Sequence, residues 1–186
     1  MAQVSKDPFS GAVLAGGRSK RFGSNKAMAN YQGQTLLCHV LQSLTEAHER
    51  FVIANQPISS VNVPIYPDLI KTGSPMSGLH SALTYANHSW VAVAACDLPN
   101  LNTTYWRFLY NAKGDSQAVV IKHDNGRLEP LAALYHRTAL PIIETRLRTN
   151  QFSLHALMAD LNTTYVASQP FALGGLFKNI NKPEDL

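Results

Sequence analysis

The chain has 186 residues, 45% of them hydrophobic and 15% charged, a composition typical of a globular protein and not of a disordered one. The net charge is +4, but the basic residues outside 18–26 are scattered, so we expect no nucleic-acid partner. No segment reaches the ~18 apolar residues of a membrane span, and residues 1–10 lack the apolar core of a signal peptide. We therefore expect one domain over residues 1–186, a cytoplasmic location and no membrane partner.

The first 112 residues alternate predicted strands with predicted helices. Short apolar runs predict strands at 10–15, 50–54, 63–66 and 90–96. Apolar residues at helical spacing predict helices at 34–48, 77–87 and 102–112, the second with Ser77 as its N-cap. This alternation predicts a three-layer α/β/α sandwich with a mostly parallel sheet. Strand 90–96 is apolar on both faces, so we expect it at the centre of that sheet.

The rest of the chain predicts an antiparallel addition to the sheet. An Asn-Gly turn at 124–126 separates two predicted strands, 117–122 and 130–135. Helices are then expected at 138–148 and 153–161, and late strands at 163–167 and 176–180. Neither the two cysteines, Cys38 and Cys96, nor the seven histidines have the spacing of metal ligands. Buried thiols in a reducing compartment are the expectation for the cysteines.

The segment LAGGRSKRFGSNK, from Leu14 to Lys26, concentrates positive charge on a glycine-rich loop. It follows the first predicted strand, and open α/β sheets bind ligands beyond the carboxyl ends of their strands. Gly16 and Gly17 let consecutive backbone N–H groups face an anion, and Arg21 and Lys26 are among four cations that can hold phosphate oxygens. We predict a triphosphate site, although a charged surface loop with turn glycines is the competing interpretation. The spacing is neither that of a Walker A loop nor that of the dinucleotide fingerprint.

Three polar residues stand where predicted strands end. Asp97 follows strand 90–96, where one carboxylate can hold Mg²⁺ together with substrate phosphates; the alternative is a cap for the helix near Asn102. Asp68 and Asn55 can hydrogen-bond a base or a ribose, and the alternative for each is an ordinary turn residue.

These motifs together resemble one enzyme family. Leu14-Ala-Gly-Gly17, Arg21-Phe-Gly23 and Lys26 look like the loop of nucleotidyltransferases that release pyrophosphate from an NTP. Further matches in order and spacing are Ala54-Asn55, Tyr66-Pro-Asp68, Gly73-Ser-Pro-Met-Ser-Gly78, Cys96-Asp-Leu-Pro99 and Asn179-Ile-Asn-Lys-Pro183. With these the chain resembles the molybdenum cofactor guanylyltransferase family from Gly11 to Leu186. The resemblance implies a nucleotide-diphospho-sugar transferase-like fold, and transfer of GMP from Mg-GTP to molybdopterin or its molybdenum form.

The same resemblance implies a role for each matching residue. Lys26 and Arg21 would hold the phosphates, Asp97 the Mg²⁺, and Asp68 and Asn55 the nucleoside. Backbone groups of Leu14, Ala15 and Gly16 would lie near the base. Asn179 and Asn181 would lie on the pterin side, although Asn181 can instead cap a final helical turn that begins near Pro183.

One segment departs from the family pattern. Glu129-Pro130 stands where family members often carry His-Pro, and a carboxylate beside a phosphorylated pterin is unfavourable unless Arg127 or a metal offsets it.

We consider two alternative functions for the chain. One is a related enzyme that uses CTP or another phosphorylated acceptor, and the other is a non-catalytic molybdopterin carrier or scaffold. Other cofactor-maturation proteins and acceptor molybdoenzymes are the protein partners that the resemblance implies.

Overall fold

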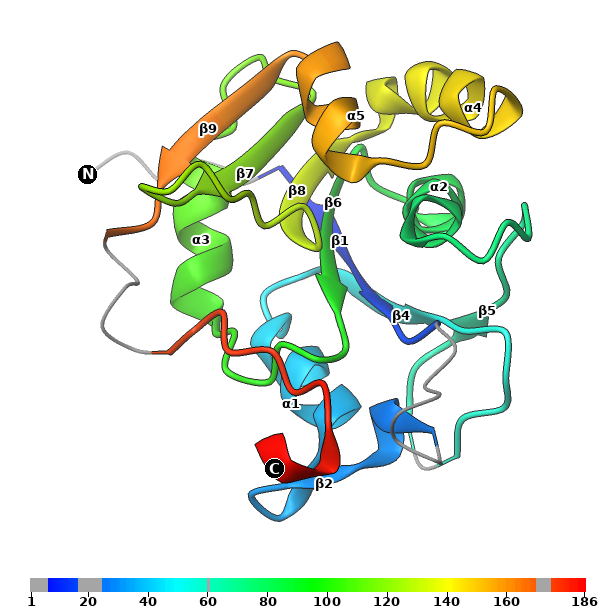
Figure 1. The fold of residues 1–186 in the computed structure, drawn as a ribbon, viewed down its shortest axis with the longest axis vertical. Helices are drawn as coiled ribbons and strands as arrows, with labels where there is room; N and C mark the ends of the chain where they lie inside the picture. Colours follow the sequence, from blue (N-terminus) through cyan, green and yellow to red (C-terminus); the bar gives the residue numbers. More distant parts are fainter. Residues whose placement is uncertain (1–6, 17–24, 60, 170–174) are drawn as a thin grey trace.

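A computed structural model describes residues 7–16, 25–59, 61–169 and 175–186. Its centre is a seven-stranded sheet with the order β5-β4-β1-β6-β8-β7-β9 (Figure 1). The strands are β1 (Phe9–Leu14), β4 (Glu49–Ile53), β5 (Ile65–Tyr66), β6 (Trp90–Ala95), β7 (Ala118–Lys122), β8 (Ala132–His136) and β9 (Thr163–Ala167). A separate two-stranded ladder joins β2 (Asn30–Tyr31) to β3 (Gln34–Thr35).

The sheet is mostly parallel, as the sequence predicts. β1 pairs in parallel with both β4 and β6, and β7 pairs in parallel with β9. Within this seven-stranded sheet of the described residues, only β8 runs antiparallel to its neighbours, β6 and β7. The predicted Asn-Gly turn precedes β8, and Gly126 has a φ of +81°, a backbone conformation that glycine adopts without strain.

Helices cover both faces of the sheet and make three layers (Figure 1). They are α1 (Leu36–Ser43), α2 (Pro75–Tyr85), α3 (Thr103–Asn111), α4 (Leu140–Arg148) and α5 (Leu154–Asp160). Successive strand residues alternate between the two cores, because side chains along a strand point to opposite faces. Val13 packs with residues of α1 and α3, whereas Ala12 packs with residues of α2, α4 and α5.

Helix α2 begins two residues before its predicted start at residue 77. Pro75 is its first residue and Ser74 its N-cap, so the prediction of Ser77 as the cap was wrong. Proline suits the first helical position, because its missing N–H has no partner there and its φ is already helical. Ser77 is instead buried inside the first turn, and its hydroxyl lies 2.6 Å from that of Thr72.

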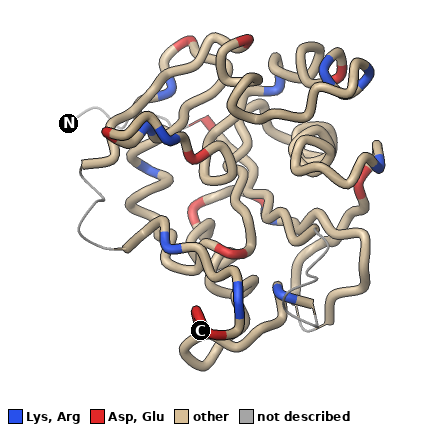
Figure 2. Tube along the Cα trace, in the orientation of Figure 1, with Lys and Arg blue, Asp and Glu red and all other residues tan. Residues whose placement is uncertain are grey.

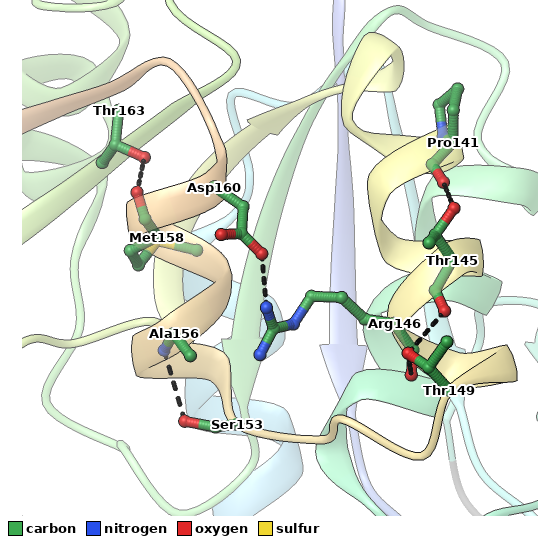
Figure 3. Close-up of polar contacts among 9 residues, drawn as sticks. All are labelled: Pro141, Thr145, Arg146, Thr149, Ser153, Ala156, Met158, Asp160 and Thr163. Atoms are coloured by element: carbon green, nitrogen blue, oxygen red, sulfur yellow. Dashed lines mark hydrogen bonds and ion pairs between the residues drawn. The ribbon is translucent and has the colours of Figure 1, made fainter.

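An ion pair joins α4 to α5 (Figure 3). The guanidinium of Arg146, which is largely buried, donates a hydrogen bond to the half-exposed carboxylate of Asp160. The hydroxyl of Ser153 accepts the N–H of Ala156 at 3.2 Å and caps α5. These contacts hold the two helices against the face of the sheet that also carries α2.

The predicted strand at 176–180 is absent. Gly175, at a φ of +60°, begins a turn in which its carbonyl accepts the N–H of Lys178 at 2.9 Å. Two hydrogen bonds join the segment to the loop after β6. The N–H of Ile180 donates to the carbonyl of Asp97, and Asn100 Nδ2 donates to the carbonyl of Gly175, both at 3.0 Å. It ends in the 3-10 turn η4 (Pro183–Asp185). The apolar run therefore buries Leu176 and Ile180 without forming a strand.

Charged residues of the described segments are distributed over the whole molecule (Figure 2). Within those segments no helix has the length and apolar character that crossing a membrane requires. Both cysteines are free thiols, Cys96 buried and Cys38 partly exposed.

Candidate active site

The carboxyl ends of β4, β1 and β6 lie level at one edge of the sheet. The N–H of Ala15 donates to the carbonyl of Ile53 at 2.9 Å, and the N–H of Cys96 donates to that of Leu14 at 3.1 Å. Gly16 continues from this edge into open space, since a Cβ there would meet no described atom within 4 Å. Gly16 is thus exposed at the place where α/β sheets bind ligands.

Lys26 and Asp97 meet at this edge. Lys26 begins the 3-10 turn η1 (Lys26–Met28), and the Asn25 side chain caps that turn by accepting the N–H of Ala27 at 3.2 Å. Asp97 lies just beyond β6, and its Oδ2 is 2.9 Å from the Lys26 Nζ. The two side chains are 15% and 22% exposed, so both remain accessible to a ligand. The predicted phosphate cation and the predicted metal carboxylate are therefore in contact.

The alternative role of Asp97 as a helix cap does not hold. Asn102 caps α3, because its Oδ1 accepts the N–H of Tyr105 at 2.9 Å. The Asp97 side chain is free of that task and points toward Lys26.

A second polar pair lies beyond β4. The Asn55 amide donates from Nδ2 to Asp68 Oδ2 at 2.7 Å, and its Oδ1 accepts the backbone N–H of Asp68 at 3.0 Å. The next residue, Leu69, donates its N–H to the Ser81 hydroxyl on α2 at 2.9 Å. Asp68 is buried and Asn55 exposed. The sequence predicts both residues as nucleoside contacts, but it does not predict that they bind each other.

The two pairs are separated by the width of β1. β4 and β6 flank β1, and two strand spacings amount to about 10 Å. That separation suits a ligand with a polar heterocycle or sugar at one end and a charged group at the other. Gly16, just beyond β1, lies between the strands that carry the two pairs.

The chemistry of this donor set suits Mg²⁺ held jointly with a substrate. Asp97 offers one accessible carboxylate, and no group of three or more His, Cys, Asp or Glu side chains gathers anywhere in the described residues. Mg²⁺ binds through one or two carboxylates plus phosphate oxygens and water, whereas a cage made only of protein ligands needs more groups. The residues present therefore fit a metal that is shared with a triphosphate.

The two residues predicted to contact the acceptor, Asn179 and Asn181, differ in whether they contact Lys26. Asn181 Oδ1 accepts a hydrogen bond from the Lys26 Nζ at 3.0 Å, so this residue belongs to the same cluster as Asp97. Asn179 lies exposed two residues earlier. Asn181 does not cap the final turn, because Lys182 is the N-cap of η4. The turn itself begins at Pro183, where the sequence places it.

Two predicted residues, Gly17 and Arg21, lie outside the described residues, as do Arg18 and Lys20. Their expected roles in the phosphate loop stay predictions. Lys26 is the one cation of the loop 14–26 that the structure describes.

The carboxylate of Glu129, the residue that departs from the family pattern, contacts two neighbouring side chains. Its Oε1 lies 2.8 Å from Arg127 Nη2 and 2.8 Å from His123 Nε2. Arg127 is the partner that the sequence predicts, whereas His123 is one that it misses, because no spacing rule marks it. Glu129 is buried, and it helps burial to raise the pKa of Tyr105. The carboxylate is thus held by Arg127 and His123 within the β7–β8 connection.

Cys96 lies next to Asp97 but is chemically inert. Burial, followed by the neighbouring Asp97 charge, raises the pKa of its thiol to about 12. The thiol stays protonated at neutral pH, so it provides neither a nucleophile nor a soft metal ligand.

A mostly parallel sheet with an exposed glycine, a lysine and a carboxylate at its strand ends suits a nucleotidyltransferase. Residues 11–164 match the model of the MobA-like NTP transferase domain. The chain belongs to the MobA-like NTP transferase family.

Relatives of known name agree with this assignment. A probable molybdenum cofactor guanylyltransferase of Bacillus cereus is 33% identical, over 95% of this chain and 93% of the relative. The protein of the same name in Bacillus anthracis is 32% identical over the same shares. The crystal structure of molybdopterin-guanine dinucleotide biosynthesis protein A from Archaeoglobus fulgidus superposes with a TM-score of 0.80 at 26% identity, covering 95% of this chain and 94% of that one.

Proposed function

We propose that this chain transfers GMP from Mg-GTP to the terminal phosphate of molybdopterin, or of its molybdenum form. Pyrophosphate is released and the guanine dinucleotide form of the cofactor is made. The observation that carries the proposal is the Lys26–Asp97 contact at the sheet edge where Gly16 faces open space. The names of the relatives support the choice of guanine and of molybdopterin. We take residues 1–186 as one catalytic domain in the cytoplasm, where reducing conditions suit its two free thiols.

The nucleotide is assigned to residues on both sides of β1. Asn55 and Asp68 bind the guanine or the ribose, and the backbone of Leu14, Ala15 and Gly16 lies along the base. Gly17, Arg21 and Lys26 hold the triphosphate. Asp97 would hold Mg²⁺, and the metal would supply charge neutralisation at the α-phosphate.

Chemistry at this site is mainly positioning. An oxygen of the acceptor phosphate forms the new bond to the α-phosphorus, while the bond from that phosphorus to the bridging oxygen breaks. The leaving pyrophosphate takes the electron pair, and Lys26 and Arg21 stabilise its added charge. The acceptor phosphate is already an anionic nucleophile, so no strong general base is needed. Asn179 and Asn181 are assigned to the acceptor side.

A panel of nucleotides tests the proposal. Purified protein is incubated with molybdopterin, Mg²⁺ and each NTP in turn, and both pyrophosphate and the dinucleotide product are measured. We expect product with GTP only. Product with CTP and none with GTP contradicts the guanylyl assignment. Normal maturation of molybdoenzymes by a Lys26→Ala variant contradicts the enzymatic role and favours a carrier.

A further inference from the structure

Lys26 has two partners that come from distant parts of the chain. Its Nζ lies 2.9 Å from Asp97 Oδ2 and 3.0 Å from Asn181 Oδ1. These partners are 71 and 155 residues away in sequence. The lysine is mostly buried in this position, with 15% of its side chain exposed. One ammonium group thus joins the loop after β1, the loop after β6 and the C-terminal segment.

The C-terminal segment holds Asn181 in place by three further contacts. The N–H groups of Asn181 and Lys182 both donate to Asp185 Oδ2, at 2.7 and 2.9 Å. These two bonds lower the pKa of the Asp185 carboxyl. On the other side, Ile180 is fully buried against Tyr31 and Leu36, and its N–H donates to the Asp97 carbonyl at 3.0 Å. Figure 1 shows this red segment passing beside β2, near the end of the chain.

These contacts conflict with nucleotide binding. Asp97 and Asn181 already take two of the three N–H groups of the Lys26 ammonium. A triphosphate that takes more than one of these groups displaces Asn181, because a phosphate oxygen is a stronger acceptor than a neutral amide. Binding of a nucleotide at Lys26 therefore requires this lysine to exchange partners.

We propose that Asn181 is a positioning residue that holds Lys26 in the free enzyme, and that Mg-nucleotide binding breaks this contact and frees the Asn181 amide for the acceptor. The nucleotide accordingly binds first and the acceptor second. This inference rests on the proposed function, since it requires an Mg-nucleotide at Lys26.

Two substitutions of Asn181 give opposite expected effects. Asn181→Ala removes a competitor for Lys26, so the affinity for a non-hydrolysable Mg-GTP analogue rises about 3-fold to 10-fold. Asn181→Asp gives Lys26 a charged partner, so the affinity falls by a similar factor. A residue with only a structural role, or one that contacts the nucleotide directly, weakens binding in the alanine variant. Glu184→Gln, an exposed change in the same final turn, is the matched control and leaves the affinity unchanged.

The measurement is calorimetry with the α,β-methylene analogue of GTP in magnesium buffer, together with hydrogen exchange of residues 175–186. In the wild type, the analogue speeds exchange in this segment at least 3-fold. Asp185→Asn, which loosens the turn and leaves the amide intact, is a second route to the same result and also tightens binding. Weaker or unchanged binding by Asn181→Ala, or slower exchange with the analogue, overturns the inference. No binding by the wild type overturns the proposed function instead.

Discussion

Asn55 and Asp68 bind each other through two hydrogen bonds that run in opposite directions, one between their side chains and one to the Asp68 backbone. This pair joins the loop after β4 to the loop after β5, and the second loop is tied to α2, where Ser81 accepts the N–H of Leu69. A buried carboxylate is thereby oriented at the sheet edge while its exposed amide partner stays in reach of a ligand. The first prediction concerns what that carboxylate recognises.

Asp68→Asn keeps the shape and the bond to Asn55 but removes the charge. Hydrogen bonds to charged groups contribute about 1.5–3 kcal/mol, so we expect the Kd for Mg-GTP to rise roughly 10-fold to 100-fold. If Asp68 accepts from the guanine amino group, wild type prefers GTP to ITP and the variant loses that preference. Calorimetry with both nucleotides measures this, and Asp115→Asn, an exposed change elsewhere, is the control. Equal GTP affinity in variant and wild type contradicts the nucleoside role.

Lys26→Ala removes the cation that faces Asp97. Removing one group that stabilises developing charge costs about 10²-fold to 10³-fold in kcat, and we expect a loss of that size in pyrophosphate release. Lys122→Ala, at the exposed end of β7, is the matched control and keeps wild-type activity. A Lys26→Ala variant within 3-fold of wild-type kcat would show that the lysine has no part in the chemistry.

The inner strands were predictable because their residues are apolar on both faces. Residues 10–14 and 90–95 form continuous apolar runs, and these become β1 and β6, paired side by side. The run 176–180 misled the prediction, because a short apolar segment predicts burial and not its partner. Its buried residue Ile180 packs against Tyr31 and Leu36 without pairing as a strand.

The residues of the site were predictable from the sequence, but the hydrogen bonds between them were not. Lys26, Asp97, Asn55 and Asp68 each follow a strand, and strand order brings them to one edge. The bond from Lys26 to Asn181 spans 155 residues, and no local pattern in the sequence encodes it. The same holds for His123, whose role beside Glu129 depends on the fold of the β7–β8 connection.

Glu49 predicts a pH dependence of stability. Burial alone would raise the pKa of its carboxyl, but hydrogen bonds from Ser10 and from Asn87 outweigh burial and lower the pKa below the ordinary 4.5. A lowered pKa means that Glu49 contributes stability above about pH 4.5, and that this contribution is lost as the pH falls through the lower folded value.

Urea unfolding measures this effect. We expect Glu49→Gln to lower the unfolding free energy at pH 7 by about 1 kcal/mol or more, and to reduce the difference in stability between pH 7 and pH 4. An unchanged pH difference in the variant means that Glu49 does not couple folding to protonation.

Cys96 is expected to resist modification. Its thiol is buried and has a pKa of about 12, whereas Cys38 is partly exposed. A thiol reagent at pH 8 should label one equivalent quickly in the native protein and two in denaturant. Mass spectrometry assigns the fast site to Cys38. Rapid native labelling of Cys96 would show that the core beside Asp97 opens freely.

The central claim is tested most directly by a crystal structure of the chain with Mg²⁺ and a non-hydrolysable GTP analogue. The account predicts guanine or ribose against Asn55 and Asp68, phosphates at Lys26, and the metal on Asp97. Nucleotide density away from the carboxyl ends of β4, β1 and β6, or a metal that does not touch Asp97, contradicts it.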